Sequence, residues 1–429
     1  MNDMTLFFNI ANLVLGALFL LCYSYQIFYI IYTLFKKPKT YAPTDQTKRY
    51  AILICGRNEA GVIGYLLDSI KAQDYPADRL DTYVCADNCT DNTAEIARAG
   101  GAIVHERHNL ELIGKGYALD ELIQTIYAAH GQDYYDGYFV VDADNLLDPH
   151  FVTEMDKAFC APEGYGVITG YRNSKNFGDS WLSAGYAIWF LHDAKHLNNA
   201  RSLLGTNCTV AGTGFLIHKD VLKAQGGWIH HCLIEDIEFV TDNYLKKVKF
   251  GYSHDAVLYD EQPVKFGQSW TQRMRWVKGY LQVLGKYGFS LIRGIFKKGG
   301  FSCFDLLTNI SAAYLLTTTA FVFNVVYLIL TLILHPAIFV STLITSLIML
   351  GGAYLSMLLL SVPVCITEKK RIHASTGMRI WGMLTFPIYM MSYVPIAIVA
   401  IFTPRVKWKP IEHKAAMSVD EVSQQNRKN

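Results

Sequence analysis

The chain has 429 residues, of which 51% are hydrophobic and 18% are charged. Soluble proteins usually carry about a quarter charged residues, so this composition argues against an ordinary soluble protein and indicates that part of the chain lies in lipid. The net charge of +2 gives no argument for nucleic-acid binding, and we expect no nucleic-acid partner. The nine cysteines form no CxxC pair and no zinc-like spacing with histidine, so we expect reduced thiols.

The first predicted element is a long apolar run without a charge, from about Leu6 to Phe35. It exceeds the roughly 20 residues that cross a bilayer. It is also too long for a signal peptide and lacks a basic start. We therefore expect residues 1–35 to form a transmembrane helix. The lysines that follow, at 36, 37 and 39, predict that the next domain is cytoplasmic and that the short N-terminus lies outside. We expect the protein to reside in the plasma membrane.

Residues 36–265 are predicted to form a cytosolic α/β domain, because short apolar runs alternate with helical patterns. The predicted strands are Tyr50 to Cys55, Asp81 to Ala86, Ala102 to His105 and Tyr138 to Val141, and the predicted helices begin near Val62, Thr93 and Lys115. Such alternation implies a mostly parallel sheet covered by helices. Ligands bind off the carboxyl ends of the strands in such sheets, and several polar motifs lie there.

From residue 266 the chain becomes basic and aromatic, and then strongly apolar. Within residues 266–303 we expect the segment from Lys278 to Lys298 to form a pair of amphipathic helices on the cytoplasmic membrane surface. Residues 304–404 are predicted to be a transmembrane region. Its three apolar runs cover about Phe304 to Leu334, Ala337 to Ile366 and Met378 to Phe402.

The third of these runs leaves two alternatives open. A full crossing would place Arg405, Lys407 and Lys409 outside, against the positive-inside rule. Alternatively, Pro387 and Pro395 bend the run into a re-entrant or interfacial element. Residues 405–429 form a polar tail, which we expect to be disordered from about residue 415.

Two paired-carboxylate motifs carry candidate chemistry. Asp142 and Asp144 follow a predicted strand, where two carboxylates suit Mg²⁺ or Mn²⁺ bound to a nucleotide diphosphate; a turn that uses Asp for local capping is the alternative. Glu235 and Asp236 open a predicted helix. They are either ordinary residues of a first helical turn or contain a general base that takes a proton from a sugar hydroxyl.

Polar loops follow the other strands. Glu59 and Asp87 could hydrogen-bond a nucleoside, and Lys115 adds a cation ahead of a glycine, although turn and cap chemistry explains each one alone. Ala211 to Gly214 is a glycine-rich turn that lets the backbone approach a ligand closely.

The pentapeptide Gln272-Arg273-Met274-Arg275-Trp276 lies between the α/β region and the apolar runs. Trp supplies a flat apolar face, Gln an amide and Arg a fixed cation, which together suit a sugar ring beside a phosphate. Interfacial anchoring of Trp and Arg is the alternative explanation. The order of the motifs along the chain favours the functional reading.

Together these motifs resemble the membrane-bound family 2 glycosyltransferases with a GT-A fold, which include cellulose, chitin, hyaluronan and poly-N-acetylglucosamine synthases. The matching stretches are Gly56 to Glu59, Asp87 to Asp91, Lys115-Gly116, Asp142 to Asp144, Gly212 to Gly214, Glu235-Asp236 and Gln272 to Trp276. The sequence departs from the family at Ile234, where Thr is frequent.

The resemblance implies a role for each predicted site residue. Asp236 would be the base; Asp144, with Asp142, would hold Mg²⁺ or Mn²⁺. Contacts to the donor or acceptor would come from Glu59, Asp87, Lys115, Asp142, Glu235, Gln272, Arg275 and Trp276.

The resemblance also implies an inverting, processive synthase that adds hexosyl units from a UDP-sugar to the non-reducing end of a polysaccharide and passes the polymer through the membrane. The alternative is a single-addition enzyme with a lipid acceptor, similar to ceramide glucosyltransferases. Four or fewer crossings are few for a polysaccharide channel, so the processive function would call for a homo-oligomer.

Overall fold

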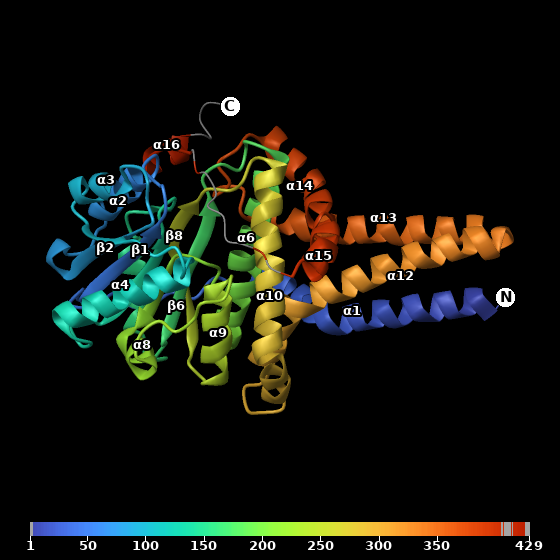
Figure 1. Cartoon of the computed structure of the whole chain (residues 1–429), viewed down its shortest axis with the longest axis horizontal. Coiled ribbons are helices and arrows are strands. Elements are labelled where there is room, and N and C mark those ends of the chain that lie inside the picture. The colour runs from blue at the N-terminus through green and yellow to red at the C-terminus, as the bar shows by residue number, and fades with distance from the viewer. Residues whose placement is uncertain (1–2, 405, 407–412, 414, 425–429) are drawn as a thin grey trace.

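A computed structural model describes residues 3–404, 406, 413 and 415–424, without the side chains of residues 312, 313 and 423. Figure 1 shows an α/β domain from which three long helices, α1 (Asp3–Phe35), α12 (Ala313–Leu334) and α13 (Pro336–Thr367), project together. Helix α10 (Phe266–Ile295) lies across the boundary between the two parts.

An eight-stranded mixed sheet with the order β3-β2-β1-β4-β7-β6-β8-β5 forms the centre of the α/β domain. Its first four strands are parallel neighbours, whereas β7 is antiparallel to both β4 and β6. The strands are β1 (Tyr50–Gly56), β2 (Leu80–Asp87), β3 (Ile103–Arg107), β4 (Gly137–Asp142), β5 (Leu146–Leu147), β6 (Val167–Ser174), β7 (Phe215–His218) and β8 (Phe250–Asp260). The predicted α/β class is confirmed.

Helices cover both faces of the sheet, so its central strands are apolar on both sides. They are α2 (Ile63–Lys71), α3 (Thr93–Ala99), α4 (Lys115–His130), α5 (Phe151–Phe159), α6 (Trp181–His192), α7 (Asn199–Leu204), α8 (Lys219–Gln225) and α9 (Glu235–Leu245), with the short turns η1 (Ala77–Arg79) and η2 (Asp193–Asn198).

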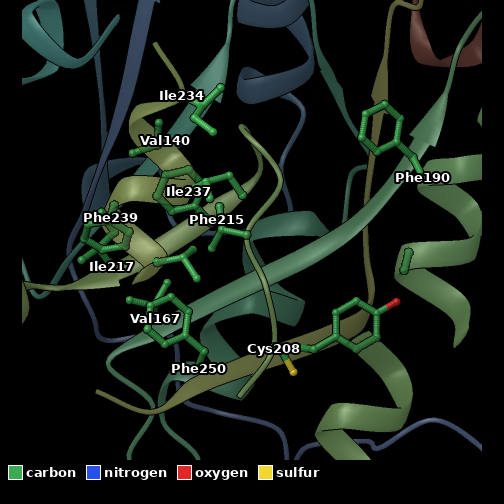
Figure 2. Close-up of a cluster of buried hydrophobic side chains, with 14 of the residues drawn as sticks. Val140, Val167, Phe190, Cys208, Phe215, Ile217, Ile234, Ile237, Phe239 and Phe250 are labelled. Carbon is green, nitrogen blue, oxygen red and sulfur yellow. The ribbon is translucent and has the colours of Figure 1, made fainter. Parts of the chain in front are cut away.

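Successive residues of a strand point to opposite faces, and the core is divided accordingly. Ile52 and Val141 belong to the cluster that contains α2 and α5. On the other face, Val140 and Phe215 pack with Phe239 of α9, as Figure 2 shows. This packing fixes the start of α9 beside the carboxyl ends of the strands.

The described residues contain four helical stretches that are long and apolar enough to cross a membrane: Asp3–Phe35, Tyr314–Leu334, Pro336–Thr367 and Thr376–Phe402. Helices α1 and α12 are paired by hydrogen bonds between Asn12 and Asn324 and by stacking of Phe8 on Tyr327, with ring centroids 4.2 Å apart. The chain is therefore a membrane protein by the length and composition of these helices.

The fourth stretch differs from the other three. It is divided into α14 (Thr376–Met391) and α15 (Tyr393–Phe402), and Figure 1 shows both crossing the base of α12 and α13 beside α10. Pro387 lies inside α14. This arrangement favours the bent alternative over a third parallel crossing. Arg405, Lys407 and Lys409, on which the charge argument depended, lie outside the described residues.

Two predictions are wrong. The segment from Lys278 to Lys298 is not a helix pair, because a continuous buried stripe that includes Val277, Val283 and Leu291 keeps α10 a single helix of 30 residues. Helix α11 (Phe301–Leu307) and the π-helical turn η3 (Thr308–Ala312) then lead into α12.

The tail is not disordered over residues 415–424, which include α16 (Val419–Gln424). Val422 is fully buried against Leu146 and Tyr259, and Met417 and Val419 pack beside it. These apolar side chains dock the tail on the α/β domain.

Candidate active site

The polar motifs converge on one cavity at the carboxyl ends of β1, β4 and β8. The cavity has a volume of about 1680 Å³. It is lined by every predicted site residue except Asp87: Glu59, Lys115, Asp142, Asp144, Glu235, Asp236, Gln272, Arg275 and Trp276. The strand-end rule therefore predicted that these residues would lie together, and their roles at the site stay predictions.

Lys115, the first residue of α4, ties three of the motifs together. Its ammonium group donates to Asp142 and, at 2.8 Å, to the carbonyl of Gly212. Burial alone would lower the pKa of Lys115, but the charges of Asp142 and Glu235 outweigh it and raise that pKa. Lys115 is therefore a permanent cation beside Asp142.

Asp144 is the acidic centre of the cavity, with only 6% of its surface exposed. Burial raises its pKa well above the ordinary value, and the charges of Asp260 and Asp142 add to this effect. A buried carboxylate among other carboxylates is a good oxygen ligand for a hard divalent cation. However, no three His, Cys, Asp or Glu side chains within the described residues gather closely enough to hold an ion by themselves.

The acidic pair opens α9, as predicted, and both carboxyl groups face the cavity. Burial, followed by the charge of Asp236, raises the pKa of Glu235 to about 7. Burial also raises the pKa of Asp236, although the backbone N–H of Ile237 opposes the shift. A base with a raised pKa takes a proton more readily than an ordinary aspartate does.

The glycine-rich turn lies beside the acidic pair. Gly212 has φ +84°, a conformation that side chains disfavour. A Cβ at Gly214 would be 1.8 Å from Leu258, so only glycine fits there. The Thr213 hydroxyl accepts the backbone N–H of Asp142 at 2.9 Å, which joins the turn to the end of β4.

The pentapeptide Gln272 to Trp276 is helical, and its side chains divide between two faces of α10. Gln272, Arg275 and Trp276 line the cavity. The Oε1 atom of Gln272 is buried and has no hydrogen-bond partner among the described residues. Arg273, in contrast, is fully buried and donates to Tyr389 O and Ser392 Oγ at the α14–α15 break, so its contacts are structural.

Asp87 lies apart from this site. It is 5% exposed and pairs with the guanidinium of Arg107 at 2.6 Å, and it does not line the cavity. The nucleoside contact expected of Asp87 stays a prediction.

Several cavity residues escaped the sequence analysis, among them Arg172, Asp260 and His413. Arg172 forms an ion pair with Asp260, and both line the cavity. The position of Asp260 at the carboxyl end of β8 is a signal that could have found it. His413 also lines the cavity, and no sequence pattern indicated it. Burial lowers its pKa, but the charges of Asp144 and Glu59 outweigh burial and raise it to about 10.

Beyond Trp276 the cavity continues between α1, α12 and α13, and its lining changes from charged to mainly apolar. Aliphatic residues such as Leu20, Val325 and Leu347 dominate this part. On α12 the lining residues extend from Tyr314 to Leu328, which is roughly 21 Å at 1.5 Å per residue. We call this part the membrane groove.

The comparisons with known proteins agree with this geometry. A family model described as "Glycosyltransferase like family 2" matches residues 48–279, more than half of the chain. The chain belongs to this family. The protein is therefore a glycosyltransferase.

Its relatives include a poly-beta-1,6-N-acetyl-D-glucosamine synthase of Staphylococcus epidermidis, 26% identical over 58% of this chain and 58% of that protein. A beta-monoglucosyldiacylglycerol synthase of Synechocystis is 23% identical over 56% of this chain and 50% of that protein. The glycosyltransferase thus aligns with less than two thirds of each relative's length.

Among solved structures, a mannosyltransferase of Pyrobaculum calidifontis in complex with GDP-Man and Mn²⁺ has a TM-score of 0.59. It is 18% identical, and the match covers 91% of this chain and 99% of that one. At this identity the likeness concerns the fold. It extends through the membrane helices as well as the α/β domain, and the predicted GT-A architecture with a helical membrane region is confirmed.

Proposed function

We propose that this glycosyltransferase transfers a hexosyl unit from a UDP-sugar, with inversion, to an acceptor that enters from the membrane groove. The observation that carries the proposal is the continuity of one cavity from Asp144 and Asp236 to the apolar surfaces of α1, α12 and α13. The donor end is charged and the acceptor end is apolar, which matches a reaction between a nucleotide sugar and a membrane-held hydroxyl.

Asp236 would act as the general base. Its carboxylate takes the proton from the acceptor hydroxyl, while that oxygen attacks the anomeric carbon and the nucleotide diphosphate leaves with the bonding electrons. Lys115 and Arg275 lie in the same cavity and provide fixed positive charge for the diphosphate. Trp276 is held edge-on by Tyr186, with ring centroids 5.7 Å apart, and offers a flat face to an acceptor sugar.

Asp144, with Asp142 beside it, would hold Mg²⁺ or Mn²⁺. The buried carboxylate of Asp144 and its neighbour Asp142 are oxygen donors of the kind that these cations take. Such an ion, when bound, neutralises negative charge that develops on the departing diphosphate.

The lining of the membrane groove favours a lipid or lipid-linked acceptor. Sugar hydroxyls inside a channel require hydrogen-bond partners, and an aliphatic lining supplies few of them. Hydrocarbon chains, in contrast, need no hydrogen-bond partners and suit an aliphatic lining. Single addition to a lipid, rather than passage of a polymer, is therefore the function that the geometry supports best.

Extension of a polysaccharide is the second candidate, because several relatives are named as poly-beta-1,6-N-acetyl-D-glucosamine synthases. Asn12, Asn324 and Ser346 place some polar groups in the groove. Under this alternative a second copy of the chain would complete a polymer channel.

We further propose that the α/β domain is cytoplasmic and that the membrane is the plasma membrane. Arg371, which follows α13, donates to the carbonyl of His254 and pairs with Asp255 of the α/β domain. The basic residues after α1 and α13 thus lie on the side of the α/β domain, as the positive-inside rule requires of a cytoplasmic domain.

The deciding experiment supplies purified protein with UDP-glucose, UDP-N-acetylglucosamine, UDP-galactose or UDP-glucuronate, Mg²⁺ or Mn²⁺, and a membrane lipid extract. We expect UDP release together with lipids heavier by one hexosyl unit. A ladder of long carbohydrate would instead establish the polysaccharide candidate. Release of UDP without either product would contradict both.

Two matched variants, one inside the groove and one outside it, test the acceptor path. Ala320→Trp places a large ring in the groove, whereas Ala416→Trp makes the same change in the docked tail, outside the groove lining. We expect the first variant to raise the acceptor KM or abolish transfer while UDP binding persists, and the second to behave as the wild type.

A further inference from the structure

Three tyrosines lie where the charged end of the cavity passes into the membrane groove. Tyr280 comes from α10, Tyr314 from the first turn of α12 and Tyr393 from the start of α15, and all three line the cavity. The rings of Tyr280 and Tyr314 stack with centroids 5.2 Å apart, and the ring centroid of Tyr393 is 5.8 Å from that of Tyr314. We call these three residues the tyrosine collar.

The collar has the proposed base on one side and the α14–α15 break on the other. Burial raises the pKa of the Tyr280 hydroxyl and the charge of Asp236 adds to this effect, so the hydroxyl lies within electrostatic reach of Asp236. The guanidinium carbon of Arg273 lies 4.8 Å from the ring centroid of Tyr393 and holds that ring in place. An acceptor that comes from the membrane groove to Asp236 therefore passes the collar.

We propose that the tyrosine collar selects an uncharged lipid headgroup that carries hydroxyls, such as a glycerol or a sugar on acyl chains, over a lipid phosphate. The inference rests on the lipid acceptor within the proposed function and names its chemical class. Each phenol is a neutral group that can donate and accept a hydrogen bond, and its ring offers an apolar face to the C–H groups of a polyol. A phosphate, in contrast, carries roughly −1.5 to −2 charges and is ordinarily bound by Arg or Lys.

The charges along the passage do not suit a phosphate. Among the described residues of α1, α12 and α13 that line the groove, none is charged. Arg201 lines the cavity, but its guanidinium donates to both carboxylate oxygens of Asp305 at 2.8 Å each, and Asp193 lies 3.5 Å away. One cation between two acidic side chains leaves no net positive charge for an anionic headgroup.

A buried amide in the same passage calls for a donor from the ligand. Gln272, Trp276 and Tyr280 follow one another at intervals of four residues, so they share one face of α10. The Oε1 atom of Gln272 is buried without a hydrogen-bond partner in the described part of the chain. A hydroxyl headgroup supplies the missing donor, whereas the three oxygens of a phosphate act as acceptors.

The groove is long enough for the acyl chains of such a lipid. Its length along α12, roughly 21 Å, exceeds half of the bilayer's hydrocarbon core, which is about 30 Å thick in total. A lipid of the leaflet next to the α/β domain can therefore keep its chains in the groove while its headgroup reaches the collar.

The first test uses the full chain in detergent and measures by native mass spectrometry which lipid it retains. Dioleoylglycerol and dioleoyl phosphatidic acid share their acyl chains and differ in the phosphate. From an equimolar mixture we expect the wild type to retain dioleoylglycerol preferentially, and Tyr314→Arg to shift the ratio toward phosphatidic acid. Equal or preferred retention of phosphatidic acid by the wild type would overturn the inference.

Transfer provides the second readout, with dioleoylglycerol, its monohexosyl derivative and undecaprenyl phosphate as acceptors. Tyr280→Phe and Tyr314→Phe keep the rings and remove the hydroxyls. We expect each to raise the KM for a neutral acceptor about 2- to 12-fold and to leave the KM for the UDP-sugar unchanged, because one hydrogen bond to the acceptor is lost. Tyr354→Phe removes a hydroxyl of α13 that contacts Leu384 O outside the cavity lining, and it should leave both KM values unchanged.

The products separate this inference from the proposed function. Preferred glycosylation of undecaprenyl phosphate would keep a lipid acceptor and overturn the inference, as would an unchanged acceptor KM in the double variant Tyr280→Phe/Tyr314→Phe. Release of UDP with a carbohydrate polymer and no glycosylated lipid would overturn single addition to a lipid and the inference together.

Discussion

Replacement of Asp236 by Asn tests the chemistry most directly. The substitution keeps the shape of the side chain and removes its ability to accept a proton. Asp236 lines the cavity at the start of α9, and burial raises its pKa, so the carboxylate is a stronger base than an exposed one. A positioned general base contributes roughly 10²- to 10⁴-fold to a rate. We therefore expect kcat to fall by that factor, which corresponds to about 3 to 5 kcal/mol of barrier.

The assay is UDP release at saturating donor, with UDP affinity measured separately by calorimetry. The donor contacts assigned to Lys115 and Arg275 are untouched, so UDP affinity should change less than threefold, well below 1 kcal/mol. Asp220→Asn, an equivalent change on the exposed surface of α8, should leave both quantities unchanged. Turnover of Asp236→Asn within tenfold of the wild type would refute the assignment of the base.

Three further predictions concern the surroundings of the site. Gly116→Ala places a Cβ 2.2 Å from His230 O and 3.2 Å from Glu235 Cβ. We therefore expect the free energy of unfolding to fall by about 1 to 3 kcal/mol and turnover to be impaired. Wild-type thermal stability of this variant would contradict the prediction. The pKa of the Glu235 carboxyl is raised to about 7, so the folded state binds this proton more tightly than the unfolded state does. Proton binding by Glu235 therefore stabilises the fold at low pH, and this stabilisation is lost as the pH rises toward and through 7. Glu235→Gln should therefore flatten the decline in Tm between pH 5 and pH 8, and an unchanged decline would show that the group is not buried as described. Arg273→Ala removes the donors to Tyr389 O and Ser392 Oγ. This loss should lower the free energy of unfolding by about 1.5 to 3 kcal/mol and expose the α14–α15 break to proteolysis. Wild-type protease resistance would show that Arg273 does not hold this junction.

Local sequence patterns predicted the first four strands of the α/β domain with the helices between them, and most of the motif residues that line the cavity, but not β5 to β8. The predicted strand from Tyr50 to Cys55 and the helix from Lys115 agree with β1 and α4 within one or two residues. These elements carry strong periodicity, and a parallel strand buried on both faces leaves an unbroken apolar run. Because carboxyl ends of parallel strands share one edge, the positions of Glu59 and Asp142 predicted their convergence without any three-dimensional information.

Features that depend on contacts between distant segments could not be read in the same way. The roles of the two arginines in the pentapeptide are an example, since Arg273 and Arg275 differ only in the face of α10 that they occupy. The break at Ser392 is another, because the sequence left a full crossing and a bend at Pro387 and Pro395 both open, and only the structure divides residues 376–402 into two helices.

The amino-acid sequence alone was enough to recognise a membrane-bound glycosyltransferase, because hydrophobic length, strand-end carboxylates and motif order are all local or ordered along the chain. The path of the membrane groove and the return of His413 to Glu59, 354 positions earlier, emerged only from the folded chain. Composition marks the tail as polar, yet a few of its apolar side chains, such as Val422, dock the tail on the α/β domain. Burial of these side chains depends on the apolar surface that they contact and not on the average polarity of the segment.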